Sequence, residues 1–195
     1  MLKKLTLVSL AIACSTPAIA QQSAHVHGFA SINLAIDEEE LQIEFVSPAE
    51  SIVGFEYAPS NATERKAVAD AIALLRDPAK LFGLPASAGC ELHEVEAERH
   101  AEGEHEEHGE HDEDEHAKHD EHEDEHAHED SNAGESHSEF HARYHFDCKN
   151  AAIETIDLRL FETWPRIEEV RVQALTPRGQ FGGNIVTSDP VIRLQ

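Results

Sequence analysis

The chain is organised around one alternating stretch, Ser138-Glu139-Phe140-His141-Ala142-Arg143-Tyr144-His145-Phe146-Asp147-Cys148. On an extended strand the aromatic and sulfur side chains would share one face, formed by Phe140, Tyr144, Phe146 and Cys148. The opposite face would carry His141, Arg143, His145 and Asp147. This pattern predicts a strand that buries its apolar face in a core and presents imidazoles on its open face.

A second short strand is predicted from Cys90 to Ala97. If the two strands are antiparallel neighbours and Cys90 lies directly opposite Cys148, Leu92 faces Phe146 and His93 faces His145. Directly opposed side chains lie about 5 Å apart at Cβ, which is close enough to chelate one ion. The sequence therefore predicts a metal-binding pair formed by His93 and His145.

An acidic, histidine-rich tract separates these two strands. From Glu91 to Glu139 there are 22 acidic residues against Arg99 and Lys118, so most of the chain's net charge of −24 lies there. Because almost nothing in it is apolar, we expect residues 99–137 to form a disordered loop. Spacings of three or four residues, which one turn of helix would bring together, recur among its candidate metal ligands. These are His105, His108, His111, His116, His119, His122, His126 and His128.

Two alternatives explain the tract without metal. It could be a solvated charge run, or an electrostatic spacer that binds a partner; solubility alone does not explain so many histidines. The charge disfavours nucleic acid and anionic membrane surfaces as partners, because both are negatively charged, and it favours attraction of cations.

The first twenty residues have the pattern of a signal peptide. Lys3 and Lys4 form a basic region, residues 5–13 are apolar, and Ala18-Ile19-Ala20 is a small-x-small cleavage site. The apolar run is too short for a stable membrane anchor. Lipoprotein processing at Cys14 is the alternative. We expect cleavage after Ala20 and a soluble periplasmic protein without stable membrane insertion.

Removal of the leader leaves two cysteines, Cys90 and Cys148, in an oxidising compartment. A disulfide between them is the default expectation, and two thiolate metal ligands are the alternative. Closing the intervening loop would constrain the unfolded chain by about 4 kcal/mol in the loop-entropy model. The bridge would also hold together the two ends of the tract.

The remaining pattern predicts a single α+β domain, with a mostly antiparallel sheet and one main helix. Its two core parts are residues 21–98 and 138–195. The helix is expected to be capped by Thr63, to bury Val68, Ile72 and Leu75, and to stop at Asp77-Pro78. An apolar loop is expected over residues 51–59, and strands over residues 25–36, 41–46, 156–160, 170–174, 185–187 and 191–194.

Three further histidines are candidate ligands on the core. His25 and His27 would lie about 7 Å apart on one strand face, a spacing that suits a bidentate chelate, although two exposed polar residues would look the same. His141 shares the face of His145 but lies about 13 Å from it along the strand. His141 is therefore too far from His145 to bind the same ion.

Several motifs resemble the ZrgA-type periplasmic zinc-uptake proteins. They are residues 25–30 (HVHGFA), 47–49 (SPA), 54–59 (GFEYAP) and 140–148, together with Cys90 and the His/acid insert. The resemblance covers essentially the whole mature chain. It implies a periplasmic zinc-binding accessory that works beside a membrane metal permease. One departure is Tyr57, at a loop position where the family often has a histidine.

The residues and the resemblance together predict capture and hand-over of Zn²⁺, without covalent chemistry. The alternatives are a periplasmic buffer for zinc, nickel, copper or cobalt, since ligand type selects weakly among these ions, and a zinc-dependent hydrolase. The sequence has no Gly-rich phosphate loop, nucleophile elbow or HExxH helix, so we expect no enzyme. Because ligand imidazoles must be neutral, binding should weaken below about pH 6.

Overall fold

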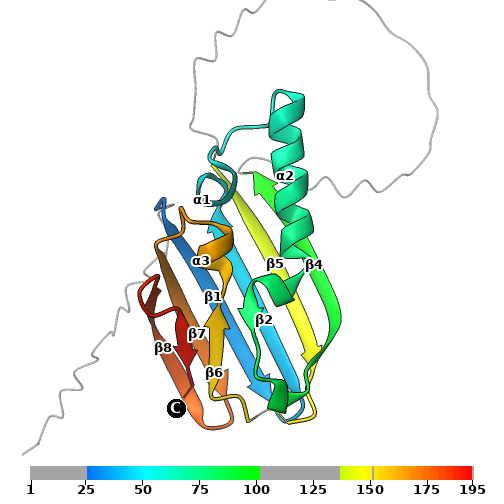
Figure 1. Cartoon of the computed structure of the whole chain (residues 1–195), viewed down its shortest axis with the longest axis vertical. Coiled ribbons are helices and arrows are strands. Elements are labelled where there is room, and N and C mark those ends of the chain that lie inside the picture. The colour runs from blue at the N-terminus through cyan, green and yellow to red at the C-terminus, as the bar shows by residue number, and fades with distance from the viewer. Residues whose placement is uncertain (1–25, 102–136, 151, 195) are drawn as a thin grey trace, which may run out of the picture.

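A six-stranded sheet in the order β4-β5-β2-β1-β7-β8 forms the body of the fold, and a smaller sheet in the order β3-β6-β9 packs over it (Figure 1). The structure is a computed structural model that describes residues 26–101, 137–150 and 152–194. Strands β1 and β7 pair in parallel, and the other pairings among these residues are antiparallel. The predicted α+β class with a mostly antiparallel sheet is confirmed.

The strands of the large sheet are β1 (Phe29–Asp37), β2 (Glu40–Pro48), β4 (Glu91–Ala101), β5 (Ser138–Asp147), β7 (Glu169–Thr176) and β8 (Gly179–Val186). Those of the small sheet are β3 (Phe82–Gly83), β6 (Thr155–Leu158) and β9 (Val191–Arg193). The helices are α1 (Ala49–Val53), α2 (Ala62–Leu75) and α3 (Leu160–Thr163), with short 3₁₀ turns at Pro78–Lys80 and Ala86–Ala88.

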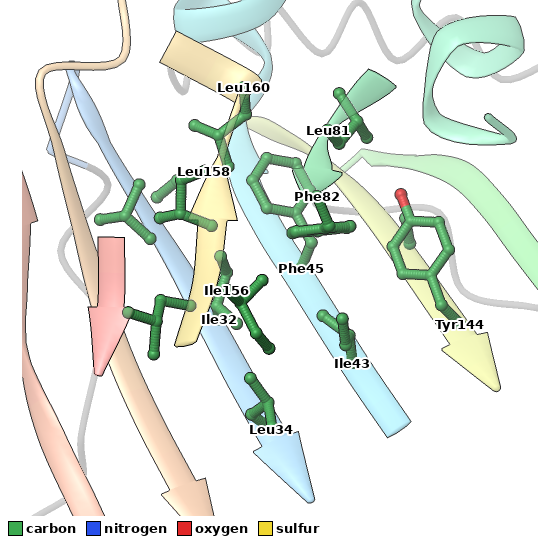
Figure 2. Close-up of a cluster of buried hydrophobic side chains, with 14 of the residues drawn as sticks. Ile32, Leu34, Ile43, Phe45, Leu81, Phe82, Tyr144, Ile156, Leu158 and Leu160 are labelled. Carbon is green, nitrogen blue, oxygen red and sulfur yellow. The ribbon is translucent and has the colours of Figure 1, made fainter. Parts of the chain in front are cut away.

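The core lies between the large sheet and the elements that cover one of its faces. Figure 2 shows Ile156 and Leu158 of β6 above side chains of β1 and β2, among them Ile32 and Phe45. Helix α2 lies over the β4–β5 side of the same face (Figure 1). Burial alternates along β5 as the sequence predicts, so its histidines lie on the opposite, open face of the sheet.

The first strand begins later than predicted. A turn closed by the Phe29 N–H and the Val26 carbonyl precedes β1, and Gly28 lies there at φ +82°, a conformation that favours glycine. The inward residues Ala30, Ile32, Leu34 and Ile36 are buried as predicted. Val26, however, is 48% exposed, and residues 26–28 form a turn, so the prediction that these three residues belong to the strand is wrong.

The helix cap also differs from the prediction. Asn61, not Thr63, is the N-cap of α2, and its side chain accepts a hydrogen bond from the Glu64 N–H at 3.0 Å. The Glu64 carboxylate in turn accepts from the Ser60 N–H and hydroxyl, and these hydrogen bonds hold the pKa of Glu64 below its usual value. The arrangement resembles a capping box that begins two residues earlier than expected, but the Glu64 carboxylate bonds to Ser60 and not to the N-cap residue.

Three other predictions need correction. Residues 49–53 form α1, although the sequence predicted an apolar loop from residue 51, and Leu160 begins α3 instead of ending a strand. Strand β8 has eight residues where only residues 185–187 were predicted. Its glycines, Gly179, Gly182 and Gly183, masked the strand signal because glycine has low strand propensity.

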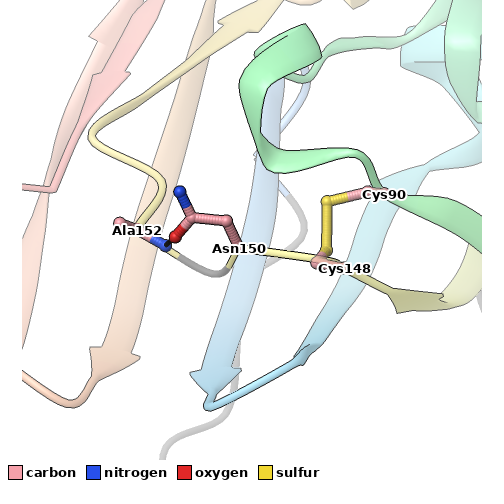
Figure 3. The surroundings of a disulfide bond; sticks show 4 residues. All are labelled: Cys90, Cys148, Asn150 and Ala152. Atoms are coloured by element: carbon pink, nitrogen blue, oxygen red, sulfur yellow. Dashed lines mark hydrogen bonds between the residues drawn. A yellow bond between two sulfur atoms is a disulfide. The ribbon is translucent and has the colours of Figure 1, made fainter.

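The disulfide between Cys90 and Cys148 is confirmed (Figure 3). It joins the residues that flank β4 and β5, at the end of this strand pair opposite Ala101 and Ser138. The prediction that the bridge holds together the two ends of the tract is therefore wrong, because the direct pairing of Ala101 with Ser138 brings those ends together. Among the described residues, no helix has the length and apolar character needed to cross a membrane.

Tyr144 ties β5 to the end of α2, because its hydroxyl donates to the Leu75 carbonyl at 2.8 Å. Burial raises the pKa of Tyr144, so the hydroxyl stays protonated and remains a donor. We expect Tyr144→Phe to lower the free energy of unfolding by about 1–2 kcal/mol, because a buried carbonyl loses its donor. Urea denaturation followed by circular dichroism measures this loss.

Tyr57→Phe is the matched control. Tyr57 also donates a hydrogen bond, to Glu64 at 3.1 Å, but this tyrosine is 51% exposed. Its removal should change the free energy of unfolding by less than about 0.5 kcal/mol. Equal losses for the two variants would contradict the assigned role of Tyr144.

Candidate functional site

The open face of the β4–β5 pair carries most of the described histidines. Outward residues of β5 face outward residues of β4 in three successive pairs: His141 with Glu98, Arg143 with Glu96 and His145 with Glu94. Arg143 also approaches Glu44 of β2, with Nε 3.5 Å from Oε1. The strand alternation thus lines up imidazoles and carboxylates, with a single arginine between His141 and His145.

His93 and His145 lie together, although not in the predicted register. Leu92 pairs with Phe146 as predicted, but an irregularity after Leu92 makes Glu94, not His93, the direct partner of His145. A β-bulge adds one residue to a strand, and sequence alternation does not reveal it. The two imidazole rings nevertheless lie 5.4 Å apart between centroids.

Carboxylates surround this pair. His93 Nδ1 lies 3.3 Å from Asp147 Oδ2, and His145 Nε2 lies 3.5 Å from Glu40 Oε2. The Nε2 atom of His145 is buried and makes no hydrogen bond within the described part of the chain. The group thus combines an imidazole nitrogen that has no hydrogen bond with a second imidazole and two carboxylates. These are donor types that zinc uses.

A second group lies further along the same strands, beside the tract. The rings of His100 and His141 are 4.6 Å apart between centroids. His100 Nε2 contacts Glu98 Oε1 at 2.9 Å, and His141 Nε2 contacts Glu139 Oε2 at 3.1 Å. His141 was predicted as a candidate, and His100 was not, because β4 runs to Ala101 and not to Ala97.

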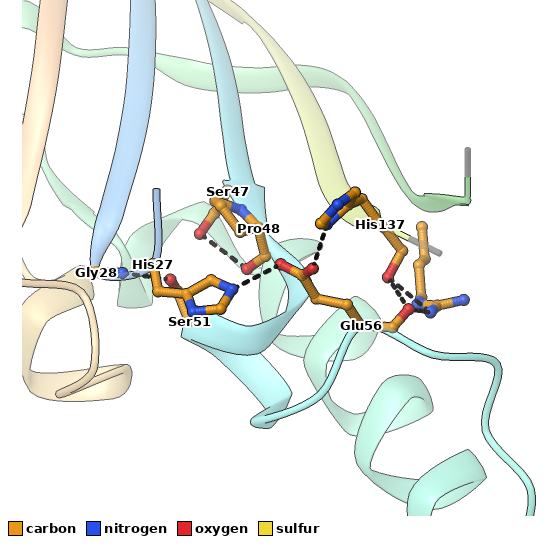
Figure 4. Close-up of polar contacts among 9 residues, drawn as sticks. His27, Gly28, Ser47, Pro48, Ser51, Glu56 and His137 are labelled. Carbon is orange, nitrogen blue, oxygen red and sulfur yellow. Dashed lines mark hydrogen bonds and ion pairs between the residues drawn. The ribbon is translucent and has the colours of Figure 1, made fainter. Parts of the chain in front are cut away.

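A third group lies at the end of the sheet where β1 and β5 begin. His27 Nε2 is 3.3 Å from Glu56 Oε1, and His137 Nδ1 is 2.7 Å from Glu56 Oε2. Figure 4 shows both imidazoles directed at this one carboxylate. His27 therefore contacts Glu56 from a turn and does not lie on a strand, as the sequence had predicted.

Hydrogen bonds from two side chains to backbone carbonyls hold the loop that carries Glu56. The Arg99 guanidinium donates to the carbonyls of Glu56 and Tyr57 at 2.7 and 3.0 Å. Arg99 and Ser138 also hydrogen-bond each other, and the Ser138 hydroxyl donates to the Glu56 carbonyl at 2.7 Å. The two residues that hold this loop thus stand at the strand ends that flank the tract.

A groove of about 680 Å³ crosses the open face of the sheet. Glu94, Glu96, Arg143 and His145 line it on the β4–β5 side, and Leu175 and Phe181 line it on the β7–β8 side. The His93–His145 group therefore lies beside a surface that solvent and small hydrated ions reach.

Several predicted ligands lie outside the described residues. They are His25, His105, His108, His111, His116, His119, His122, His126 and His128. Within residues 26–101, 137–150 and 152–194, no set of three or more His, Cys, Asp or Glu side chains is already gathered around one point as a metal cage. The three groups are open arrangements in which carboxylates hold paired imidazoles.

Sequence reasoning missed His100, His137 and Glu56. By composition, His100 and His137 belong to the tract, where only the run from His105 to His128 was singled out. A signal for His100 was present, because Glu98-Arg99-His100 repeats the pattern of Glu139-Phe140-His141. Glu56 had no such signal, since its partners lie 29 and 81 residues away in sequence.

Imidazole nitrogens together with carboxylate oxygens suit borderline divalent ions such as zinc. A comparison with curated proteins gives no match. A family model described as ZrgA family zinc uptake protein matches residues 24–194, a span that includes every group described above. The chain therefore belongs to the ZrgA family of zinc uptake proteins.

Proposed function

We propose that this protein captures Zn²⁺ in the periplasm and passes it to a membrane metal transporter. Membership of a zinc uptake family supports the metal and the direction of traffic. The Cys90–Cys148 disulfide and the residues that precede the family match fit a secreted protein. The charge of −24 favours accumulation of cations near the chain.

The observation that carries the proposal is the pairing of His93 with His145. Two imidazoles from neighbouring strands lie together, one of them has a buried nitrogen without a hydrogen bond, and carboxylates flank both. Two nitrogen ligands from a rigid sheet supply half of a tetrahedral zinc site. Carboxylate or water can complete it, and a ligand of that kind exchanges easily during hand-over.

The tract would act before this fixed site. Many weak sites on one segment hold ions at high local concentration and release them readily, so an ion that leaves one imidazole is quickly rebound by another. The tract joins β4 and β5 directly. It therefore delivers ions next to the strands that carry His100, His141, His93 and His145.

Zinc titration of the metal-free chain against a competing chelator tests the proposal. We expect saturable binding, with at least one site whose dissociation constant is below micromolar. Binding no tighter than micromolar would contradict capture of dilute zinc. Deletion of the gene should slow growth in zinc-depleted medium; if it instead lowers only the tolerance of excess zinc, the protein is a buffer.

We expect the double variant His93→Ala/His145→Ala to lose one equivalent of chelator-resistant zinc. The fold should persist, because the His93 side chain is 60% exposed and that of His145 is 31% exposed. Equilibrium dialysis with metal analysis gives the zinc count, and thermal melting checks the fold. An unchanged zinc count would show that the pair is not a site.

A further inference from the structure

One three-residue pattern occurs on both strands that flank the tract. Glu98-Arg99-His100 ends β4, and Glu139-Phe140-His141 begins β5. In each copy the carboxylate and the imidazole are two residues apart, so they share one face of the strand. The residue between them points inward, and Phe140 is fully buried.

The antiparallel register brings the two copies together. Glu98 is the direct partner of His141, and His100 is the direct partner of Glu139, with Arg99 opposite Phe140. A local two-fold axis between the strands therefore relates one Glu-x-His copy to the other. Directly opposed side chains lie about 5 Å apart at Cβ, so the four outward groups form a square on the open face. We call Glu98, His100, Glu139 and His141 the Glu–His square.

The side-chain contacts follow the same symmetry. In each copy the histidine Nε2 contacts the carboxylate of its own strand, at 2.9 Å for His100 and 3.1 Å for His141. The rings lie 4.6 Å apart and cross at 70°. On the β5 side the groups are half-buried, with 30% of the His141 side chain and 24% of the Glu139 side chain exposed.

We propose that the Glu–His square binds one zinc ion between β4 and β5, with two imidazole nitrogens and two carboxylate oxygens as ligands. The donor set matches the four ligands of a tetrahedral site. Each Nε2···O contact is replaced by two bonds to the metal, one from the imidazole nitrogen and one from the carboxylate oxygen. A neutral imidazole then carries its proton on Nδ1, and an imidazolium releases its Nε2 proton to solvent. Within the described part of the chain these donors are neighbours but are not gathered around one point, so side-chain rotations would close the site around the ion.

The surroundings keep this ion separate from the His93–His145 group. Arg143 follows His141 on the same face and reaches Glu96 and Glu44, with its guanidinium 3.8 and 3.5 Å from their carboxylates. Because this fixed cation pairs with Glu96 and Glu44, those carboxylates are less available as metal ligands between the two groups. Two ions on the same strand pair are thus held on either side of one arginine.

The position of the square suits transfer from the tract. Ala101 and Ser138 are the last partners of the β4–β5 ladder, and the square comes next to them on the open face. Along the open face, an ion from the tract meets these ligands before it reaches the His93–His145 group. This inference rests on the proposed function, and it adds that the Glu–His square is the site on the folded sheet that receives zinc from the tract.

Zinc protection against diethyl pyrocarbonate, which modifies exposed imidazoles, tests the proposal on the full chain. Mass spectrometry should show that zinc protects His100 and His141. In His141→Ala we expect His100 to lose this protection, because the two imidazoles share one ion. Removal of one ligand should weaken the site at least about 100-fold, since groups that only orient a ligand already contribute about 10- to 100-fold.

His145→Ala is the matched control, from the same strand and face, and it should leave His100 protected. Glu98→Gln/Glu139→Gln should weaken protection of both histidines while the circular dichroism spectrum stays unchanged. Protection of His100 that survives in His141→Ala would overturn the square. So would zinc that protects other histidines but neither of these two, and that result would leave the proposed function intact. A chain that binds no zinc at all would overturn both.

Discussion

Replacement of residues 102–136 by a short glycine-containing turn is expected to remove most of the bound zinc and to leave the fold intact. This segment carries eight of the chain's 15 histidines. Its removal should not strain the sheet, because Ala101 and Ser138 are direct partners and antiparallel neighbours can be joined by two to five residues. Metal analysis after dialysis gives zinc per chain, and thermal melting reports the fold.

A second variant separates the contribution of the imidazoles to zinc binding from the contribution of the acidic side chains. Substitution of its eight histidines by serine keeps the length and the acidic residues. This variant should lose as much zinc as the deletion, because imidazole and not carboxylate is the stronger zinc donor here. Both variants should retain the tightest site, and loss of that site on deletion would contradict its assignment to the folded face.

Substitution of both Cys90 and Cys148 by alanine is expected to lower the free energy of unfolding by about 4 kcal/mol. The bridge spans 58 residues of sequence, so the reduced unfolded chain gains much conformational freedom. Urea denaturation of the oxidised chain and of the double variant measures the difference. Cys148 is buried and Cys90 half-buried, so part of the loss would also come from altered packing.

The chain without residues 102–136 is the control for the entropic part of the disulfide's contribution to the free energy of unfolding. There the bridge closes a much smaller loop, and the loop-entropy model lowers its contribution by about 0.7 kcal/mol. Loss of packing should be the same in both backgrounds. An identical loss with and without residues 102–136 would therefore contradict the view that the bridge acts by constraining the segment between β4 and β5.

The parts of the fold that sequence predicted best have strong alternation. Strand β5 was predicted within one residue because large apolar side chains recur on its inner face. The turn before β1 was missed because Val26 continues the alternation by type, although Gly28 takes a positive φ there. Strand β8 was predicted only at its end, over residues 185–187, because three glycines replace the side chains that would reveal a period in the rest.

The candidate site was predicted in part. The proximity of His93 and His145 was expected from strand pairing, and the rings do lie together, but through a bulge that no local sequence signal marks. His100 was overlooked because Arg99, His100 and Ala101 resemble the tract by composition while they pair as strand. Contacts such as those of Glu56 with His27 and His137 depend on tertiary packing, which sequence periodicity does not encode.

The direct pairing of Ala101 with Ser138 has a consequence for how much metal such a protein can carry. Since the segment leaves and re-enters the sheet at adjacent points, its length is independent of the scaffold, and each doubling costs only about 0.6 kcal/mol in closure entropy. If the segment binds zinc as proposed, insertions or deletions there would change the number of ions bound without changing the stability much. The folded domain could then stay the same while the length of the segment, and with it the capacity for zinc, varies.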